Sequence, residues 1–308
     1  MESYARQQVR DYYIFSMDRR SLIIKEIKIM PELPEVETVL SALKTVMLGQ
    51  IIKTAFVGRK DLRWPLPKNL AYRIEGRFVE GLERRGKYIL IRLEGEEFLL
   101  IHLGMSGSIR IHESQPSPQK HDHFMMTISS SRSDYGSRFV VLHDPRRFGW
   151  IDLFSEAELP THSLLSRLGP EPLDFSSLSN HFQHIFRGRT GTIKNILMDQ
   201  KIIAGIGNIY ANESLFHAKI SPRRKTANLI GSRAERLAFS VVKVLNNAIE
   251  DGGTSLRDHV QPNGELGYFS QRLSVYGRTG LPCVSCQTMI KSLTQSGRSS
   301  FYCPSCQR

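Results

Sequence analysis

The sequence predicts an α+β protein of two domains, and three features of its 308 residues support this fold class. Apolar residues near the start recur at helical spacing, and short alternating or apolar runs typical of antiparallel strands follow them. After residue 172 the periodic runs become helical. All four cysteines lie in the last 26 residues, as two closely spaced pairs. We therefore expect an N-terminal helix with an antiparallel β-sandwich, then a helical domain, then a small cysteine module.

The order of these runs predicts the individual elements. The first helix extends from Pro34 to Met47, and Gly49 ends it. Glu35 and Glu37 suit the positive end of its dipole. Seven runs predict the strands of a two-layer sandwich: 51–57, 77–82, 87–93, 97–103, 123–129, 138–143 and 150–154. Helices are predicted at 176–187, 192–198, 207–218 and 231–250, before a glycine-rich loop at 251–267.

Changes of composition along the chain predict the domain boundaries. Residues 156–172 contain three prolines and Gly169, which is typical of a hinge. The predicted divisions are an extension at 1–30, a β-sandwich domain at 31–155, the hinge, a helical domain at 173–267 and the cysteine module at 268–308.

The charge indicates the class of partner. The formal net charge is +12 and the isoelectric point is about 9.7, which favour a polyanionic partner, nucleic acid first. The alternative is a basic surface without a function. No apolar run approaches ~18 residues, so no transmembrane helix is expected. The position of the cysteines argues against a secreted disulfide scaffold.

The segment Pro31-Glu32, directly after Met30, has two interpretations. Inside a chain it is a turn that leads into a helix. As an N-terminus, after removal of Met30, it carries a free secondary amine with a pKa of ~7.7–8, against ~10.4 for lysine. Such an amine condenses with an aldehyde to a charged iminium. We expect residues 1–30 to be a mis-assigned start, disordered if made; the alternative is a prosegment that is removed by proteolysis.

The paired cysteines are the strongest local motif. Cys283 and Cys286 are followed after sixteen residues by Cys303 and Cys306. This spacing suits a tetrahedral zinc site on two hairpin knuckles, and four protein ligands leave no position for a catalytic water. Two disulfides or free thiols are the alternatives. The strands between the pairs carry Arg298, placed to reach a groove or a phosphate.

Four further segments suit nucleic acid. Gly205-Ile206-Gly207-Asn208 opens a helix and can bind an anion, with Asn208 as the N-cap or as a phosphate donor. Lys194 can face the same anion, or be a solvated lysine.

Met105 lies between glycines at a strand end, as an apolar wedge or as a core residue. Arg146 and Phe148 point the same way if their segment is extended, so they can read a base edge and fill a gap. The alternative is a surface turn with a buried Phe. Residues 84–87 form a basic hairpin tip, or are simply solvated.

Together these segments resemble the formamidopyrimidine-DNA glycosylases, bacterial enzymes that excise 8-oxoguanine and ring-opened purines. The resemblance covers Pro31 to Arg308. It rests on collinear motifs: PELPEVET, RRGKY, IHLGMSG, KHDH, DPRRFG, LGPEPL, GIGNIYANE and the two CxxC pairs.

The resemblance implies a role for each candidate. Pro31 is the nucleophile that forms a Schiff base with C1′, and Glu32 is the proton donor. Lys87 serves β-elimination and Arg298 serves δ-elimination, both with phosphate contacts. Met105, Arg146 and Phe148 fill the gap left by the flipped base. Further DNA contacts are implied for His121, Arg189, Lys194 and Asn208. Arg189 departs from the family pattern, which has a run of lysines there.

The resemblance also implies the setting. It implies a helix-two-turn-helix motif around Asn208, a lesion-capping loop near 253–268, one structural zinc ion and no catalytic metal. The implied partner is double-stranded DNA with oxidised purines, acted on by a monomeric, cytoplasmic, nucleoid-associated bacterial enzyme. The alternatives are an endonuclease VIII-like enzyme for oxidised pyrimidines and a non-catalytic zinc-containing DNA-binding protein. With residues 1–30 attached, Pro31 is an amide without a free lone pair, so that form is expected to be inactive.

Overall fold

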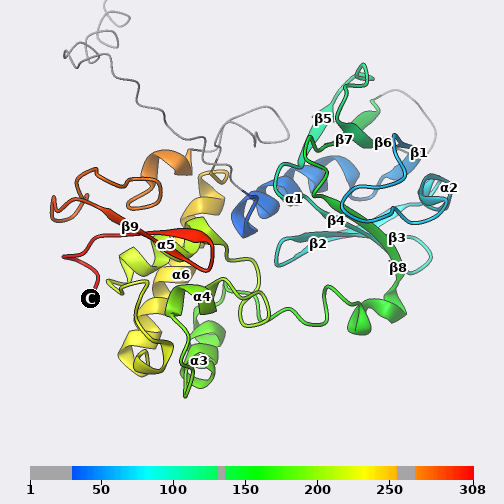
Figure 1. Cartoon of the computed structure of the whole chain (residues 1–308). Helices are drawn as coiled ribbons and strands as arrows, with labels where there is room; N and C mark the ends of the chain where they lie inside the picture. The colour runs from blue at the N-terminus through cyan, green and yellow to red at the C-terminus, as the bar shows by residue number, and fades with distance from the viewer. Residues whose placement is uncertain (1–29, 131–135, 255–267) are drawn as a thin grey trace, which may run out of the picture.

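The computed structural model describes residues 30–130, 136–254 and 268–308. The predicted extension, apart from Met30, and most of the loop at 251–267 lie outside this range. Figure 1 shows a β-rich half and a helical half, with the first helix near their junction.

Within the described residues, the β-rich half contains two helices and eight strands. They are α1 (Leu33–Met47), β1 (Ile51–Val57), α2 (Leu70–Ile74), β2 (Val79–Arg85), β3 (Tyr88–Leu93), β4 (Glu97–His102), β5 (Ser108–His112), β6 (Asp122–Ser129), β7 (Arg138–His143) and β8 (Trp150–Ser155).

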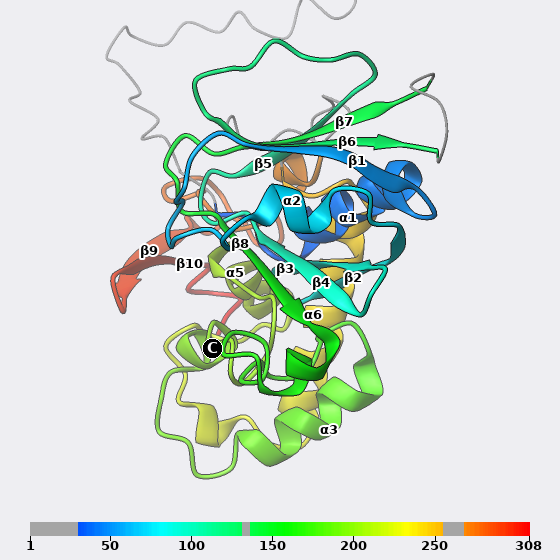
Figure 2. The same ribbon diagram turned by 90° about the vertical axis from the view of Figure 1, so that its right-hand side faces the viewer.

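The strands form the predicted antiparallel sandwich. One sheet has the order β1-β6-β7-β5 and the other β2-β3-β4-β8, with every pairing antiparallel. Figure 2 shows the two sheets as separate layers. One apolar core, including Ile52, Ile91, Phe124 and Leu142, draws on both sheets and on α1. The alternating burial expected of half-covered sheets thus brings the two inner faces together.

Helix α1 forms where the sequence predicts it. Its start is a reciprocal capping box, in which Glu32 is the N-cap and Glu35 accepts from the Glu32 backbone N–H at 2.8 Å. Val39, Leu43 and Met47 are fully buried, because α1 contacts β2, β3 and β6 as well as α6 of the helical half. The helix therefore joins both halves at the residues that follow Pro31.

Two short elements were not predicted. Strand β5 has only five residues and carries Arg110 within an apolar pattern, and α2 has one turn and a half. Strand β2 also runs three residues further than predicted and includes Arg84 and Arg85. Sequence periodicity is weak over so few residues, so tertiary pairing decided them.

The helical half follows a linker with one 3₁₀ turn, η1 (Glu156–Thr161). Its elements are α3 (Phe175–Ile185), α4 (Ile193–Leu197), α5 (Asn208–His217), η2 (Thr226–Asn228), α6 (Ser232–Glu250) and η3 (Phe269–Arg272). Helices α3 and α5 both pack on α6 around a core that includes Phe182, Phe186 and Tyr210. All four predicted helices are confirmed, each within two residues of its expected ends.

The chain closes with a hairpin of β9 (Lys291–Gln295) and β10 (Arg298–Tyr302). A small core of Val275, Ile290, Cys283 and Cys303 fastens the cysteine module to Phe216 of α5. Over the described range, no helix combines the length and the apolarity needed to cross a membrane.

Gly104 is expected to tolerate no side chain. Its φ is +66°, and a Cβ there would lie 2.3 Å from the Phe148 backbone. Gly104→Ala should lower the free energy of unfolding by roughly 2–4 kcal/mol. Alanine is unfavourable in a left-handed backbone conformation, and its Cβ would also overpack the site. Gly76 also has positive φ, +79°, but nothing within 4 Å, so Gly76→Ala should cost only roughly 1–2 kcal/mol. Urea unfolding measures both, and equal losses would show that the close approach is unimportant.

Candidate active site and DNA interface

The Glu32 carboxylate binds the start of α5, across the junction of the two halves. Its Oε2 accepts from the Gly207 N–H at 2.6 Å and its Oε1 from the Ile209 N–H at 2.8 Å. The sequence predicted an anion at this helix start, and the anion in the structure is this carboxylate.

The N-cap of α5 is Gly207, so the expectation that Asn208 caps the helix is wrong. Asn208 is the first helical residue and pairs with Tyr276 instead.

Burial gives the Glu32 carboxyl a pKa that suits a general acid. Its residue is 2% exposed, and desolvation raises its pKa to about 7. Lys87 and the two backbone donors oppose this rise, while Glu35 adds to it. A carboxyl with a pKa near 7 can hold its proton at neutral pH and donate it.

Glu35 joins a second buried network at the same junction. Its Oε1 accepts from the Tyr210 hydroxyl at 2.5 Å and from the Thr254 N–H at 2.8 Å. Burial, with Glu35 nearby, raises the pKa of Tyr210 well above its ordinary value, so Tyr210 stays a donor. Glu35 therefore does more than balance the α1 dipole. It ties the backbone of Glu32 to the helical half.

A cavity of about 190 Å³ reaches Met30, the residue before Pro31. Pro31 is buried, and its neighbour Met30 lines the cavity together with Lys87, His102 and Arg298. Burial lowers the pKa of Lys87, although Glu32 and Glu35 oppose the shift. Burial also lowers the pKa of His102 to about 4, so this imidazole is neutral at pH 7. The structure thus brings together four of the predicted catalytic positions: Pro31, Glu32, Lys87 and Arg298.

The hairpin tip before Lys87 is not a solvated basic turn. Lys87 is 7% exposed, and the Arg84 side chain is 6% exposed and paired with carboxylates. The solvated alternative for residues 84–87 is therefore wrong.

The predicted gap-filling residues lie on two loops that are joined to each other. The Arg146 guanidinium lies over the Phe148 ring, 4.9 Å from its centroid. The expected extended segment is instead a turn, with a φ of 60° at Arg147. Phe148 is 39% exposed and Met105 is half-buried, so the alternatives of a buried Phe and a core Met are wrong. Asp144, fully buried, accepts from Ser106 Oγ at 2.6 Å and from the Gly149 N–H at 2.7 Å. One carboxylate thus sets the distance between the Met105 loop and the Arg146 loop.

The remaining predicted DNA contacts differ in exposure. His121 is half-buried, and its carbonyl accepts from the Asp144 N–H at 2.9 Å. Arg189 is half-buried and donates to the Ile185 carbonyl at 2.8 Å.

Lys194 is fully buried, so a solvated lysine is excluded. Its Nζ donates to the Ser299 carbonyl and to Ser300 Oγ, each at 2.8 Å, beneath β10. Burial and the Arg298 charge lower the pKa of Lys194 to about 8.

The four cysteines meet at one point. All four Sγ atoms lie within 4.8 Å of one another, with separations of 3.9 Å for Cys283–Cys306 and 3.4 Å for Cys286–Cys303. A zinc tetrahedron with Zn–S bonds of ~2.3 Å has edges of about 3.8 Å, and a disulfide needs about 2.05 Å. The geometry therefore fits four thiolates around one structural zinc ion and not two disulfides.

Sequence reasoning missed the residues that hold the site together. Tyr210 and Glu213 lie in the motif GIGNIYANE and Asp144 lies in DPRRFG, but no role was predicted for any of the three. The Glu213 carboxylate, 1% exposed, accepts from the N–H groups of Ser274, Val275 and Tyr276 at 2.8–3.0 Å. Glu213 thereby fixes the segment that leads into the cysteine module. Its signal in the sequence is its place as the last residue of the motif GIGNIYANE.

Three family models match the chain. They are the formamidopyrimidine-DNA glycosylase N-terminal domain at residues 30–151, the H2TH domain of the same enzymes at 168–260, and a zinc finger found in these enzymes and in IleRS at 280–308. The formamidopyrimidine-DNA glycosylase of Roseobacter denitrificans is 47% identical over 91% of this chain and all of its own length. That of Dinoroseobacter shibae is 49% identical with the same coverage. The chain belongs to the formamidopyrimidine-DNA glycosylase family.

Solved glycosylase structures agree with this family in fold. MutM (Fpg) from Thermus thermophilus superposes with a TM-score of 0.78 at 38% identity, over 90% of this chain and 98% of that one. A Lactococcus lactis Fpg variant in complex with Fapy-dG DNA gives 0.80 at 34% identity, over 90% of this chain and all of that one. The predicted two-domain α+β fold with a helix-two-turn-helix half and a zinc finger is confirmed.

Loss of zinc should disconnect the hairpin that carries Arg298. Cys286→Ser is expected to abolish stoichiometric zinc, lower the melting temperature and weaken DNA binding by about tenfold or more, since a charge-assisted contact contributes roughly 1.5–3 kcal/mol. Zinc content by mass spectrometry and DNA affinity by fluorescence anisotropy measure this. Ser285→Ala is the matched control, because only the backbone of Ser285 contacts Cys283. A Cys286→Ser protein that still binds one zinc tightly would contradict the assignment.

Proposed function

We propose that this protein is a bifunctional DNA glycosylase and abasic-site lyase of base excision repair, which excises 8-oxoguanine and formamidopyrimidines from double-stranded DNA. The observation that carries the proposal is the buried Glu32 carboxyl, with a pKa of about 7, which follows Pro31 directly and interacts with Lys87. Lys87 and Arg298 line the cavity that Met30, the residue before Pro31, also lines. Family membership over nearly the whole chain supports it. So do structural neighbours bound to Fapy-dG DNA and to abasic-site DNA.

The first step is attack of the Pro31 amine on C1′ of the damaged nucleotide, with Glu32 supplying the proton that base departure requires. The resulting iminium acidifies C2′. Loss of that proton breaks the 3′ C–O bond, and a second elimination breaks the 5′ C–O bond, which leaves a one-nucleotide gap. Lys87, whose pKa is lowered by burial, is suited to accept a proton in the first elimination. Arg298 is proposed to serve the second and to bind phosphate.

Access to C1′ requires the nucleotide to leave the helix, at a cost of a few kcal/mol of stacking. We assign Met105, Arg146 and Phe148 to the vacated space, with Arg146 pairing with the orphaned cytosine. The other proposed contacts are His121, Arg189, Asn208 and, through the strand that it supports, Lys194. Such phosphate contacts make affinity fall with salt.

The proposal keeps the predicted organisation. The catalytic sandwich domain spans 31–155, the hinge 156–172, the helix-two-turn-helix domain 173–267 and the zinc finger 268–308. The enzyme acts as a monomer at the nucleoid in the cytoplasm, as its bacterial relatives and its DNA substrate suggest.

A second substrate class has one specific observation in its favour. A Lactococcus lactis Fpg with a TM-score of 0.79 and 34% identity was solved with DNA that contains an oxidised pyrimidine. Excision of 8-oxoguanine opposite cytosine, compared with excision of thymine glycol, distinguishes a purine enzyme from an endonuclease VIII-like one.

A free Pro31 amine is essential to the reaction. Protein that begins at Pro31 should be trapped covalently on 8-oxoguanine:cytosine DNA by borohydride, and protein with residues 1–30 attached should not, because an amide nitrogen has no lone pair to donate. Peptide mapping locates the adduct. Equal trapping of the two forms would refute the assignment to Pro31, and trapping of neither would favour a non-catalytic DNA-binding protein.

The rate of base excision should depend on pH as a bell. It rises as the Pro31 amine loses its proton, with a pKa of ~7.7–8. It falls as Glu32 loses its proton, because its raised pKa of about 7 keeps it protonated below that pH and ionised above it. Single-turnover rates measure both limbs.

Glu32→Gln should lower excision about 10²–10⁴-fold, while trapping on a preformed abasic site, which needs no departing base, should fall far less. Equal losses in the two assays would contradict the role of Glu32.

A further inference from the structure

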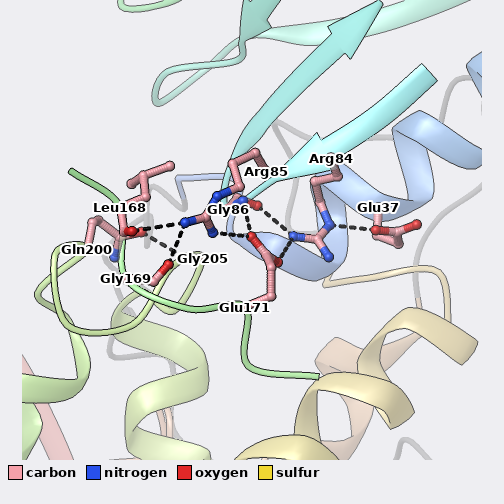
Figure 3. Close-up of polar contacts among 9 residues, drawn as sticks. All are labelled: Glu37, Arg84, Arg85, Gly86, Leu168, Gly169, Glu171, Gln200 and Gly205. Atoms are coloured by element: carbon pink, nitrogen blue, oxygen red, sulfur yellow. Dashed lines mark hydrogen bonds and ion pairs between the residues drawn. The ribbon is translucent and has the colours of Figure 1, made fainter. Parts of the chain in front are cut away.

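Glu171, in the linker between the two halves, holds the turn that precedes Lys87. Its carboxylate accepts from Arg84 Nη1 at 2.5 Å, from Arg85 Nη1 at 2.8 Å and from the Gly86 N–H at 2.7 Å. Figure 3 shows the three donors converging on this one side chain. We refer to Glu171, Arg84, Arg85 and Gly86 as the linker knot.

The two guanidinium groups of the knot are held on their other sides as well. Arg84 Nε donates to Glu37 of α1 at 2.5 Å. Arg85 Nη2 donates to the carbonyls of Leu168 and Gly169 at 2.9 and 2.7 Å. The turn is therefore fastened both to the linker and to the helix that follows Pro31.

Gly86 packs the turn against the helical half. Its φ is +57°, and a Cβ there would lie 3.3 Å from the Ala204 Cβ and 3.5 Å from the Gly205 nitrogen. The Gly205 carbonyl in turn accepts from the Leu33 N–H at 3.1 Å. Lys87 is the next residue after Gly86, so little freedom remains in the backbone that carries its side chain into the cavity.

The knot differs from an ordinary surface ion pair. Arg84 is nearly buried, with 6% of its side chain exposed, so loss of Glu171 would leave it one partner fewer and the Gly86 N–H unpaired. Burial raises the pKa of Glu171, but Arg84, the Gly86 N–H and Arg85 together bring this pKa below its ordinary value, so the carboxylate is charged. At the other end of the linker, Glu156 pairs with Arg92 and both side chains are 39–40% exposed, where such a pair contributes little.

We propose that Glu171 is a positioning residue for the lyase reaction: through the linker knot it sets the place of Lys87 in the cavity relative to Pro31 and Glu32. The lyase part of this inference rests on the proposed function. The knot also makes the position of Lys87 depend on the linker. A change in the contact between the two halves of the protein would therefore move Lys87 within the cavity.

The experiment compares Glu171→Gln with the matched control Glu156→Gln, in protein that begins at Pro31. An amine-reactive reagent labels lysines, and mass spectrometry follows Lys87, buried Lys194 and exposed Lys243. In Glu171→Gln, labelling of Lys87 relative to Lys243 should rise about fivefold or more through local opening, with Lys194 unchanged. Single-turnover cleavage of abasic-site DNA should slow about tenfold, because misplaced groups lose rate steeply. The Glu156→Gln protein should match wild type in both measurements.

The outcomes separate the possible causes. Labelling of Lys87 and Lys194 that rises together would mean general destabilisation and would overturn the proposal, as would no change at Lys87. If Glu171→Gln does not fold, Glu171→Asp, which keeps the charge but withdraws it from the turn, is measured in the same way. Wild-type protein that cannot be trapped on abasic-site DNA would refute the proposed function, and the labelling result would still decide whether Glu171 positions Lys87.

Discussion

The hydrogen bonds from the α5 backbone to the Glu32 carboxylate are the contacts on which the rest of the site depends. They join the segment next to Pro31 to the helical half, at 2.6 Å from Gly207 and 2.8 Å from Ile209. The N-terminus of a helix stabilises negative charge, yet burial here raises the pKa of Glu32 to about 7. The backbone N–H groups of α5 hold the carboxyl in place and favour its charged form. Burial at the junction of the two halves excludes water and disfavours the charged form. Burial outweighs the groups that favour the charge, so the pKa lies near 7 and the proton can be both held and donated at neutral pH.

The same arrangement recurs around the site. Asp144 joins the two gap-filling loops, Glu213 holds the start of the cysteine module, and Glu171 holds the turn before Lys87. In each case one carboxylate accepts several hydrogen bonds, at least one of them from a segment that lies far from it in the sequence. Charge-assisted bonds are short and directional, so they fix geometry more narrowly than apolar packing does. A reaction that moves protons between several groups needs that precision, since small displacements are costly in rate.

Much of the fold was predictable from the sequence, because its signals are local. The run from Pro34 to Met47 has helical periodicity, and α1 (Leu33–Met47) matches it within one residue. Seven strands and four helices likewise follow from alternation and periodicity. Strand β5 and helix α2 did not, since elements of five residues carry too few periods and are decided by their neighbours. The pairing of strands across two sheets is also non-local, so composition predicts a sandwich without giving its strand order.

The sequence by itself determined the chemistry that is available: a proline with an acid beside it, two cysteine pairs at zinc spacing, and a basic chain with Met, Arg and Phe on glycine-rich loops. Only the tertiary structure decided which groups meet and in what protonation state. Asn208 is not the cap of α5, Lys194 is buried beneath β10, and Glu35 binds Tyr210. The partners of Lys194 and Glu35 lie more than a hundred positions away in the sequence. Such surroundings shift a pKa away from the ordinary value of the residue type.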